Sequence, residues 1–311
     1  MRIFTCVALI FISIPVLANS PEIFSRPSAL EPAILFWTRI YTEVDTNAGL
    51  IHDQENLEVV YEIVRFDKES SSSREKQIAA LKLQIRSALL NVSTGKRDGL
   101  TPLEAAVLDA WPSDVSNARL RRAADNIRFQ LGQANKFRAG INRSGLWRDF
   151  MRTTFSDFAL PVELTALPHV ESSFSPNAYS KVGAAGIWQF TRNTGRLFMR
   201  VDHVVDERMD PYRATHAAAR LLKRNFELTQ SWPLAITAYN HGAEGMLRAK
   251  RTVGSDRIDD IIEHYEGRSF GFASRNFYAA FLAALQIDND PHRFFHDLEI
   301  MSPLTLVTLE T

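Results

Sequence analysis

Apolar residues recur at helical spacing near the start of the chain. Residues 31–41 carry isoleucine and aromatic side chains on one face, which predicts a helix. Residues 57–66 (LEVVYEIVRF) are rich in β-branched and aromatic side chains, so they favour a short strand, although they also scan as the start of a helix. The polar, serine-rich residues 67–76 predict a surface loop or a helix start.

A capping box marks the next element. Thr101 is followed by proline and, three residues after Thr101, by glutamate, which predicts a helix running toward Ala110. Residues 114–137 place apolar side chains on one face and arginines opposite, which predicts a single continuous helix. These patterns predict an N-terminal helical region over residues 19–145. Because no glycine-rich or proline-rich linker follows this region, we expect it to pack against the rest of the chain.

Helix starts are clearer in the second half. Proline at positions 161, 211 and 233 lies where the first turn of a helix tolerates it, and Asp210 is a suitable cap before Pro211. Residues 210–229 then carry an alanine and leucine stripe typical of a buried helix. The predicted fold class is therefore mainly α.

The first residues are typical of a secretory leader. Arg2 precedes an apolar run over residues 3–17, and small side chains follow at the position where a signal peptidase would cleave. The alternative is a short membrane anchor, but about 15 apolar residues fall short of the roughly 20 that span a bilayer. We therefore expect a signal peptide over residues 1–18, a mature protein without a membrane anchor, and a periplasmic location. Cys6, the only cysteine, lies within this leader.

Composition narrows the classes of ligand. The chain has 36 basic and 36 acidic side chains, so no long-range field favours nucleic acid as a partner. Four histidines, at positions 169, 203, 216 and 241, lack the paired spacing of a zinc site, and a structural or surface role is expected for each. No metal and no cofactor are expected.

One carboxyl group has a setting suited to catalysis. Residues 160–174 (LPVELTALPHVESSF) form an apolar helix that ends near Glu171. A carboxyl group among apolar residues has a raised pKa, because burial disfavours its charged form. Glu171 could then donate a proton near neutral pH. The alternative for this segment alone is a surface glutamate at a helix end.

Two later clusters could bind a sugar. Residues 183–190 combine two glycines with adjacent Trp188 and Gln189, a set that suits a sugar ring, although a core tryptophan and an internally bonded glutamine are the ordinary alternatives. Tyr239 and Asn240 end an apolar helix just before a glycine, so they could offer a hydroxyl and an amide to one cleft. A simple turn is the alternative there.

Taken together, these motifs resemble the catalytic domain of the lytic transglycosylase family. The resemblance rests on Glu171-Ser172, on the segment 186–189 (GIWQ) and on the segment 238–242 (AYNHG), in this order, and it covers about residues 146–285. Residues 36–50 also resemble the N-terminal region of one member. The resemblance implies a lysozyme-like catalytic domain, assigned to residues 146–290, and a substrate of peptidoglycan glycan strands.

The resemblance also implies roles for single residues. Glu171 matches the sole catalytic residue of the family, and Ser180, Gln189, Tyr239 and Asn240 match residues that contact the glycan. The family has a further tyrosine near the end of the domain. The ungapped position falls on a phenylalanine here, and Tyr278 follows one residue later, so Tyr278 is included as a substrate-binding candidate. Members usually continue into glycan-binding repeats, whereas residues 291–311 are expected to form only a C-terminal tail.

The number of carboxylates bears on the reaction. Most glycosidases use two, yet the sequence has no acidic residue between Ser172 and Val201. The family resemblance implies a reaction that needs one: the C6 hydroxyl of N-acetylmuramic acid attacks its own C1 and leaves a 1,6-anhydro end. Two alternatives stay open, a hydrolytic muramidase that uses a second carboxylate such as Asp206, and a catalytically silent peptidoglycan-binding protein.

Overall fold

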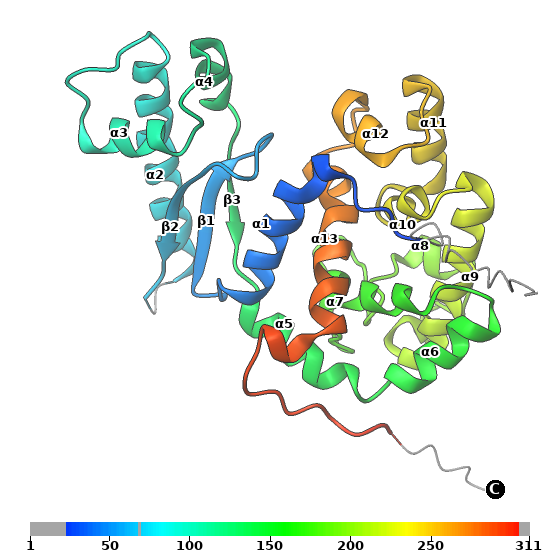
Figure 1. The fold of residues 1–311 in the computed structure, drawn as a ribbon. Helices are drawn as coiled ribbons and strands as arrows, with labels where there is room; N and C mark the ends of the chain where they lie inside the picture. The colour runs from blue at the N-terminus through cyan, green and yellow to red at the C-terminus, as the bar shows by residue number, and fades with distance from the viewer. Residues whose placement is uncertain (1–22, 68–69, 305–311) are drawn as a thin grey trace, which may run out of the picture.

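The computed structural model describes residues 23–67 and 70–304 (Figure 1). The predicted leader over residues 1–18, including Cys6, lies outside these ranges, as do the last seven residues of the predicted tail. The described chain forms a helical body and a smaller lobe that contains a β-sheet (Figure 1). The predicted fold class, mainly α, is confirmed.

The helical body surrounds one long central helix, α13 (Phe272–Asn289). Helices α1 (Glu31–Thr42) and α10 (Trp232–His241) both pack on α13 (Figure 1). The other helices of the body are α5 (Ala134–Ser144), α6 (Arg148–Asp157), α7 (Leu167–Ser172), α8 (Arg192–Gly195), α9 (Pro211–Thr229), α11 (Ala243–Val253) and α12 (Ile258–His264).

Local sequence signals place several helix starts where they were predicted. Thr101 and Glu104 form both hydrogen bonds of a capping box at the start of α3 (Pro102–Asp109). The side chain of Asp210 accepts hydrogen bonds from the backbone of Tyr212 and Arg213 at the start of α9. The predicted helix over residues 31–41 corresponds to α1. All three predictions are confirmed: the two caps depend on contacts within one turn of helix, and α1 on its apolar spacing.

The lobe contains a three-stranded antiparallel sheet in the order β2-β1-β3. Its strands are β1 (Ala48–Asp53), β2 (Val60–Arg65) and β3 (Ile127–Leu131). The strand favoured over residues 57–66 is therefore confirmed, whereas the central strand β1, all of whose residues are buried, was not predicted. Helices α2 (Ser71–Val92), α3 and α4 (Asn117–Ala123) complete the lobe (Figure 1).

The single helix predicted over residues 114–137 is wrong. The segment divides into α4, strand β3 and the start of α5. The apolar residues of β3 alternate with Arg128 and Gln130, which is the period of a strand, and β3 pairs with β1 from Gly49↔Leu131 to Asp53↔Ile127. The pairing partner lies about 80 residues earlier in the chain, so helical periodicity within the segment could not reveal it.

The buried residues form two cores that do not divide the chain at residue 145. The larger core joins residues 24–57 to residues 137–295, so α1 belongs to the helical body. The smaller core lies between the sheet and helices α2 to α4. The N-terminal segment that contains α1 is thus packed into the same core as the second half. The domain boundaries at residues 145 and 290 stay predictions.

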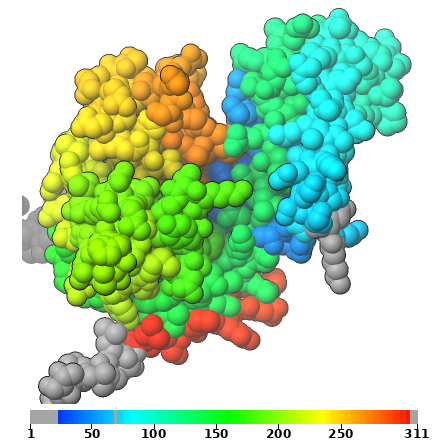
Figure 2. Space-filling model, turned by 180° about the vertical axis from the view of Figure 1, so that it is seen from behind, coloured from blue at the N-terminus to red at the C-terminus, as the bar shows by residue number. Residues whose placement is uncertain are grey.

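Two surface features complete the fold. Figure 2 shows the molecular surface hollowed between the helical body and the N-terminal lobe. Residues 291–304 pass below α5 (Figure 1), where the backbone of Met301 donates to the carbonyl of Asn142 at 2.9 Å, and Phe295 is buried in the larger core. Within residues 23–67 and 70–304, no helix has the length and apolar character needed to cross a membrane.

Candidate active site

Glu171 lies in the last turn of α7, and this helix end is held from two sides. The hydroxyl of Ser172 donates to the carbonyl of Ile187 at 2.8 Å. The guanidinium of Arg143, on α5, donates to the carbonyls of Ser173 (2.7 Å) and Phe174 (3.1 Å). Ser173 and Phe174 adopt φ values of 50° and 55°, a left-handed conformation that ends the helix sharply. The backbone that carries Glu171 is therefore fixed.

Beneath Glu171, α7 rests on a buried polar contact. His169 is fully buried between the rings of Phe137, at 4.8 Å, and Phe174, at 4.5 Å. Its Nε2 lies 3.1 Å from Asp288, which also accepts from Arg148 at 2.7 Å. Burial would raise the pKa of Asp288, but its bonds to His169 and Arg148 hold this pKa at about 2. His169 thus has the structural role that the sequence favoured.

The environment of Glu171 changes its acidity. Burial raises the pKa of its carboxyl group to about 8, and no charge on the described residues contributes to the shift. Two phenols share this environment: burial and the nearby charge of Glu171 raise the pKa values of Tyr41 and Tyr239. The setting predicted from the apolar sequence around Glu171 is therefore present, and at neutral pH the carboxyl group holds a proton it can donate.

Residues 180–190, which include the segment 183–190, form a tight loop beside α7. The backbone of this loop closes through the bridges Tyr179↔Ala185 and Ala185↔Phe190. Gln189 has a φ of 48°, and its side-chain amide donates to the carbonyls of Gly186 (2.9 Å) and Ala178 (3.3 Å). These bonds occupy the amino group of Gln189, so its carbonyl oxygen remains as the acceptor for a ligand.

Ser180 is tied into the same loop. Its hydroxyl oxygen accepts a hydrogen bond from the backbone NH of Ala184 at 2.9 Å, which leaves the hydroxyl proton available for donation. Both Ser180 and Gln189 are half-buried. The two candidates therefore come from one internally bonded loop, which presents one donor and one acceptor.

Trp188 belongs to the core and does not face a ligand. Its side chain is fully buried, stacks on Phe155 at 5.7 Å, and donates its indole NH to Thr215 at 3.0 Å. The suggestion that this indole suits a sugar ring is wrong, and the core alternative is correct. Gln189 has a left-handed backbone conformation. The side chain of Trp188 is buried in the core, whereas that of Gln189 is half-buried.

Tyr239 and Asn240 lie at the end of α10 and meet the other two segments. The hydroxyl of Tyr239 donates to the carbonyl of Trp188 at 2.8 Å, which connects α10 to the loop. The side chain of Asn240 is exposed, and the hydroxyl of Ser274, on α13, donates to its carbonyl oxygen at 2.9 Å. This bond directs the amino group of Asn240 outward, where it can donate to a ligand.

Tyr278 does not join this cluster. It is fully buried, and its hydroxyl donates to the carbonyl of Ser25 at 2.7 Å, so its inclusion as a substrate-binding residue is wrong. The preceding position, Phe277, is also buried and has no hydroxyl. One residue along a helix turns the side chain by about 100°, which accounts for the failure of the offset match.

Three residues of the site were missed by the sequence analysis. Tyr41 was recognised only as part of a helical apolar face, yet it lies close enough to Glu171 for the carboxylate charge to raise the pKa of its phenol. Ser274 and Arg208 act on Asn240 and on the loop, respectively. None carries a local signal, because each reaches the site through packing between distant segments. The described residues include no group of three histidine, cysteine, aspartate or glutamate side chains that could hold a metal ion.

The fold and the site define a class: a mainly α, lysozyme-like domain with a half-buried acid, Glu171, beside a polar loop. Comparison with known proteins finds a similar family. Residues 154–262 match the family described as the transglycosylase SLT domain. The match lies inside the segment 146–290 that was assigned to catalysis.

Two curated proteins are similar in sequence to part of this chain. The chain is 39% identical over 95 residues to membrane-bound lytic murein transglycosylase D of Escherichia coli (strain K12), which covers 30% of this chain and 21% of that protein. It is 35% identical over 94 residues to a putative tributyltin chloride resistance protein of Alteromonas sp. (strain M-1), which covers 29% of this chain and 44% of that protein. The chain thus spans about a fifth of the length of the first relative and under half of the second.

Proposed function

We propose that this protein is a lytic transglycosylase that cleaves the β-1,4 bond between N-acetylmuramic acid and N-acetylglucosamine in peptidoglycan, and that it acts in the periplasm. The observation that carries the proposal is the half-buried carboxyl group of Glu171, whose pKa is raised to about 8 by desolvation. The match of residues 154–262 to the SLT domain family and the similarity to a lytic murein transglycosylase support this substrate.

In the proposed reaction, Glu171 acts first as an acid and then as a base. Its proton passes to the glycosidic oxygen as the bond from C1 of N-acetylmuramic acid to that oxygen breaks. The carboxylate then takes the proton of the C6 hydroxyl as O6 bonds to C1. The products are a free N-acetylglucosamine hydroxyl and a 1,6-anhydromuramic end, and no water is consumed. Because O6 belongs to the reacting sugar, it supplies a high effective molarity.

The surrounding polar groups suit the binding of a glycan. The loop offers the hydroxyl of Ser180 as a donor and the carbonyl of Gln189 as an acceptor. Asn240 offers its amino group, held outward by Ser274. Tyr239 ties the end of α10 to the loop, so these groups keep fixed relative positions. In this proposal Tyr239 and Asn240 hold the glycan and stabilise the positive charge that develops at C1.

The surroundings of Asp206 argue against the hydrolytic alternative. Both carboxylate oxygens of Asp206 accept hydrogen bonds from Arg208, at 2.8 and 2.6 Å, and these bonds lower its pKa. A carboxylate engaged in this way is poorly suited to activate water. A catalytically silent binding protein would gain nothing from a carboxyl group with a raised pKa, because burial without a partner destabilises the fold.

Glutamine at position 171 tests the proposal. Glu171→Gln keeps the size of the side chain and removes its titration, so the release of soluble fragments from purified sacculi should fall by at least about 10³-fold. Glu163→Gln, a control in the 3₁₀ turn just before α7, should stay within about twofold of the wild type. Substantial turnover by Glu171→Gln, with both variants folded, would refute the role of Glu171.

A further inference from the structure

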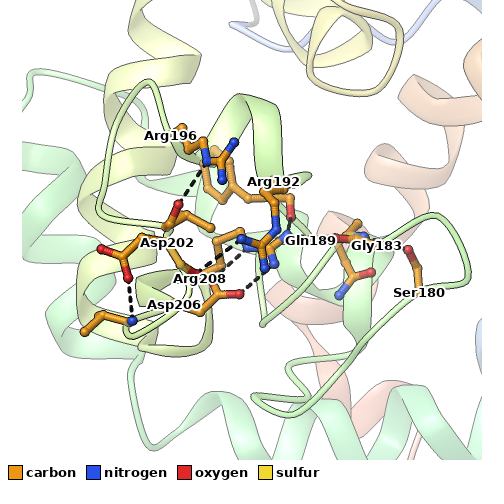
Figure 3. Close-up of polar contacts among 12 residues, drawn as sticks. Ser180, Gly183, Gln189, Arg192, Arg196, Asp202, Asp206 and Arg208 are labelled. Carbon is orange, nitrogen blue, oxygen red and sulfur yellow. Dashed lines mark hydrogen bonds and ion pairs between the residues drawn. The ribbon is translucent and has the colours of Figure 1, made fainter.

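Arg208 is a fully buried arginine at the base of the loop over residues 180–190. It follows Asp206 in a short 3₁₀ turn, η3 (Glu207–Met209), and its side chain has no exposed surface. Its Nε and one terminal nitrogen donate to Asp206 at 2.8 and 2.6 Å. The other terminal nitrogen donates to the carbonyls of Gly183 (2.7 Å) and Phe190 (2.9 Å). Figure 3 shows Arg208 between Asp206 and the loop that carries Gly183 and Gln189.

These contacts bind both ends of the turn over residues 183–190 within this loop. Gly183 and Phe190 bracket the turn that contains Gln189, so one guanidinium group fixes the distance between the two ends. The backbone of Arg208 also touches the middle of the loop: a Cβ added to Gly186, which has a φ of +74°, would lie 1.8 Å from the carbonyl oxygen of Arg208. The loop therefore lies directly on η3.

The opposite side of the loop is bonded to the catalytic elements. Ser172, next to Glu171, donates to the carbonyl of Ile187, and Tyr239 donates to the carbonyl of Trp188. The loop thus lies between Arg208 on one side and the ends of α7 and α10 on the other. A change at Arg208 would alter the position of the loop relative to these helix ends.

We propose that Arg208, oriented by Asp206, is a positioning residue that holds the loop over residues 180–190 and so places Ser180 and Gln189 against the glycan. The inference rests on the proposed function for its substrate. Arginine suits this role because its planar guanidinium group donates in fixed directions to a carboxylate and to two carbonyls at once. A lysine ammonium group is a point charge and lacks this planar geometry.

Asp206 is necessary for the arrangement because a buried cation needs a partner. Without its carboxylate, Arg208 would keep two neutral carbonyl acceptors and a charge that is out of contact with water. Asp206→Asn keeps the shape but replaces one acceptor oxygen by a donor that faces another donor. We therefore expect Asp206→Asn and Arg208→Lys to affect the same loop.

The chain offers a matched control in the same segment. Arg200 pairs with Asp202 at 2.7 Å, but the arginine side chain is 59% exposed, in contrast to that of Arg208. Arg200→Gln removes an arginine from an exposed ion pair, which usually contributes little. This variant should resemble the wild type in every measurement below.

The first measurement is hydrogen exchange of the full-length protein, which needs no turnover. Amides of residues 183–190 should exchange at least about tenfold faster in Arg208→Lys and Asp206→Asn, while those of α9 and α13 keep their wild-type rates. Unchanged exchange in residues 183–190 would overturn the inference. Faster exchange in all three segments would also overturn it, because it would assign Arg208 to overall stability.

The second measurement is the kinetics of fragment release from glycan strands. Both variants should raise KM by roughly 10- to 100-fold, because the two hydrogen bonds that Ser180 and Gln189 offer the glycan would be weakened or lost. They should leave the pH dependence of kcat unchanged, because the burial of Glu171 is retained. A loss confined to kcat, or a shifted pH profile, would contradict the inference. If the wild type released no fragments, the proposed function would fail, and hydrogen exchange would still decide the role of Arg208.

Discussion

Replacement of Glu171 by glutamine should change how the stability of this protein depends on pH. In the folded wild type the carboxyl group has a pKa of about 8, against an ordinary value of 4.5. Between these two values the folded chain holds a proton that the unfolded chain releases. The free energy of unfolding therefore decreases as the pH rises from about 4.5 to about 8, and the proton no longer contributes above that range.

The size of this effect follows from the shift. A pKa raised from 4.5 to about 8 corresponds to at most about 5 kcal/mol between the two ends of the range, with a slope near 1.4 kcal/mol per pH unit. Glu171 is half-buried, so its remaining contact with water reduces the full value. Glutamine does not titrate, so Glu171→Gln should gain stability relative to the wild type as the pH rises.

Urea unfolding followed by tryptophan fluorescence, at intervals between pH 5 and pH 9, measures this difference directly. The free energy of unfolding of Glu171→Gln minus that of the wild type should increase steadily and level off above about pH 8. Glu163→Gln should give a flat difference over the same range. Parallel profiles for Glu171→Gln and the wild type would show that burial does not perturb this carboxyl group, and the reasoning would be refuted.

Three further outcomes can be checked independently. Thr101→Ala removes one bond of the capping box of α3 and should lower the free energy of unfolding by about 1 kcal/mol in urea, whereas an unchanged value would contradict the cap. Gly186→Ala should destabilise the protein and impair fragment release far more than Gly183→Ala, because only the first would collide with Arg208; equal effects would contradict the close approach. Limited proteolysis should not release a stable fragment over residues 146–311 quickly, because α1 shares the larger core, and rapid release would contradict that packing.

Elements specified by local chemistry could be predicted from the sequence. The caps at Thr101 and Asp210 each depend on side chains within a few residues, and both helix starts are present. Strand β3 could not be predicted in the same way. Ile127 and Leu131 also fit a helical stripe in the sequence, and the partner strand β1 is distant in the chain, so tertiary pairing overrode the local pattern.

The same distinction between local and tertiary information applies to the residues of the candidate site. Glu171 could be recognised because it follows an apolar segment in sequence, whose Leu164 and Leu167 are fully buried in the structure. The direction of a side chain was harder to predict: Trp188 and Gln189 are adjacent, yet the first is in the core and the second reaches the surface. Tyr278 shows the same difficulty on a helix, where one residue separates a buried phenol from the position the motif requires.

The most direct test of the central claim, that Glu171 alone drives cleavage without water, is the mass of the glycan ends released from purified sacculi in water enriched in heavy oxygen. The wild type should release anhydromuramic ends that are one water lighter than reducing ends and contain no heavy oxygen, and Glu171→Gln should release almost none. Reducing ends that carry heavy oxygen would identify a hydrolase and contradict the account.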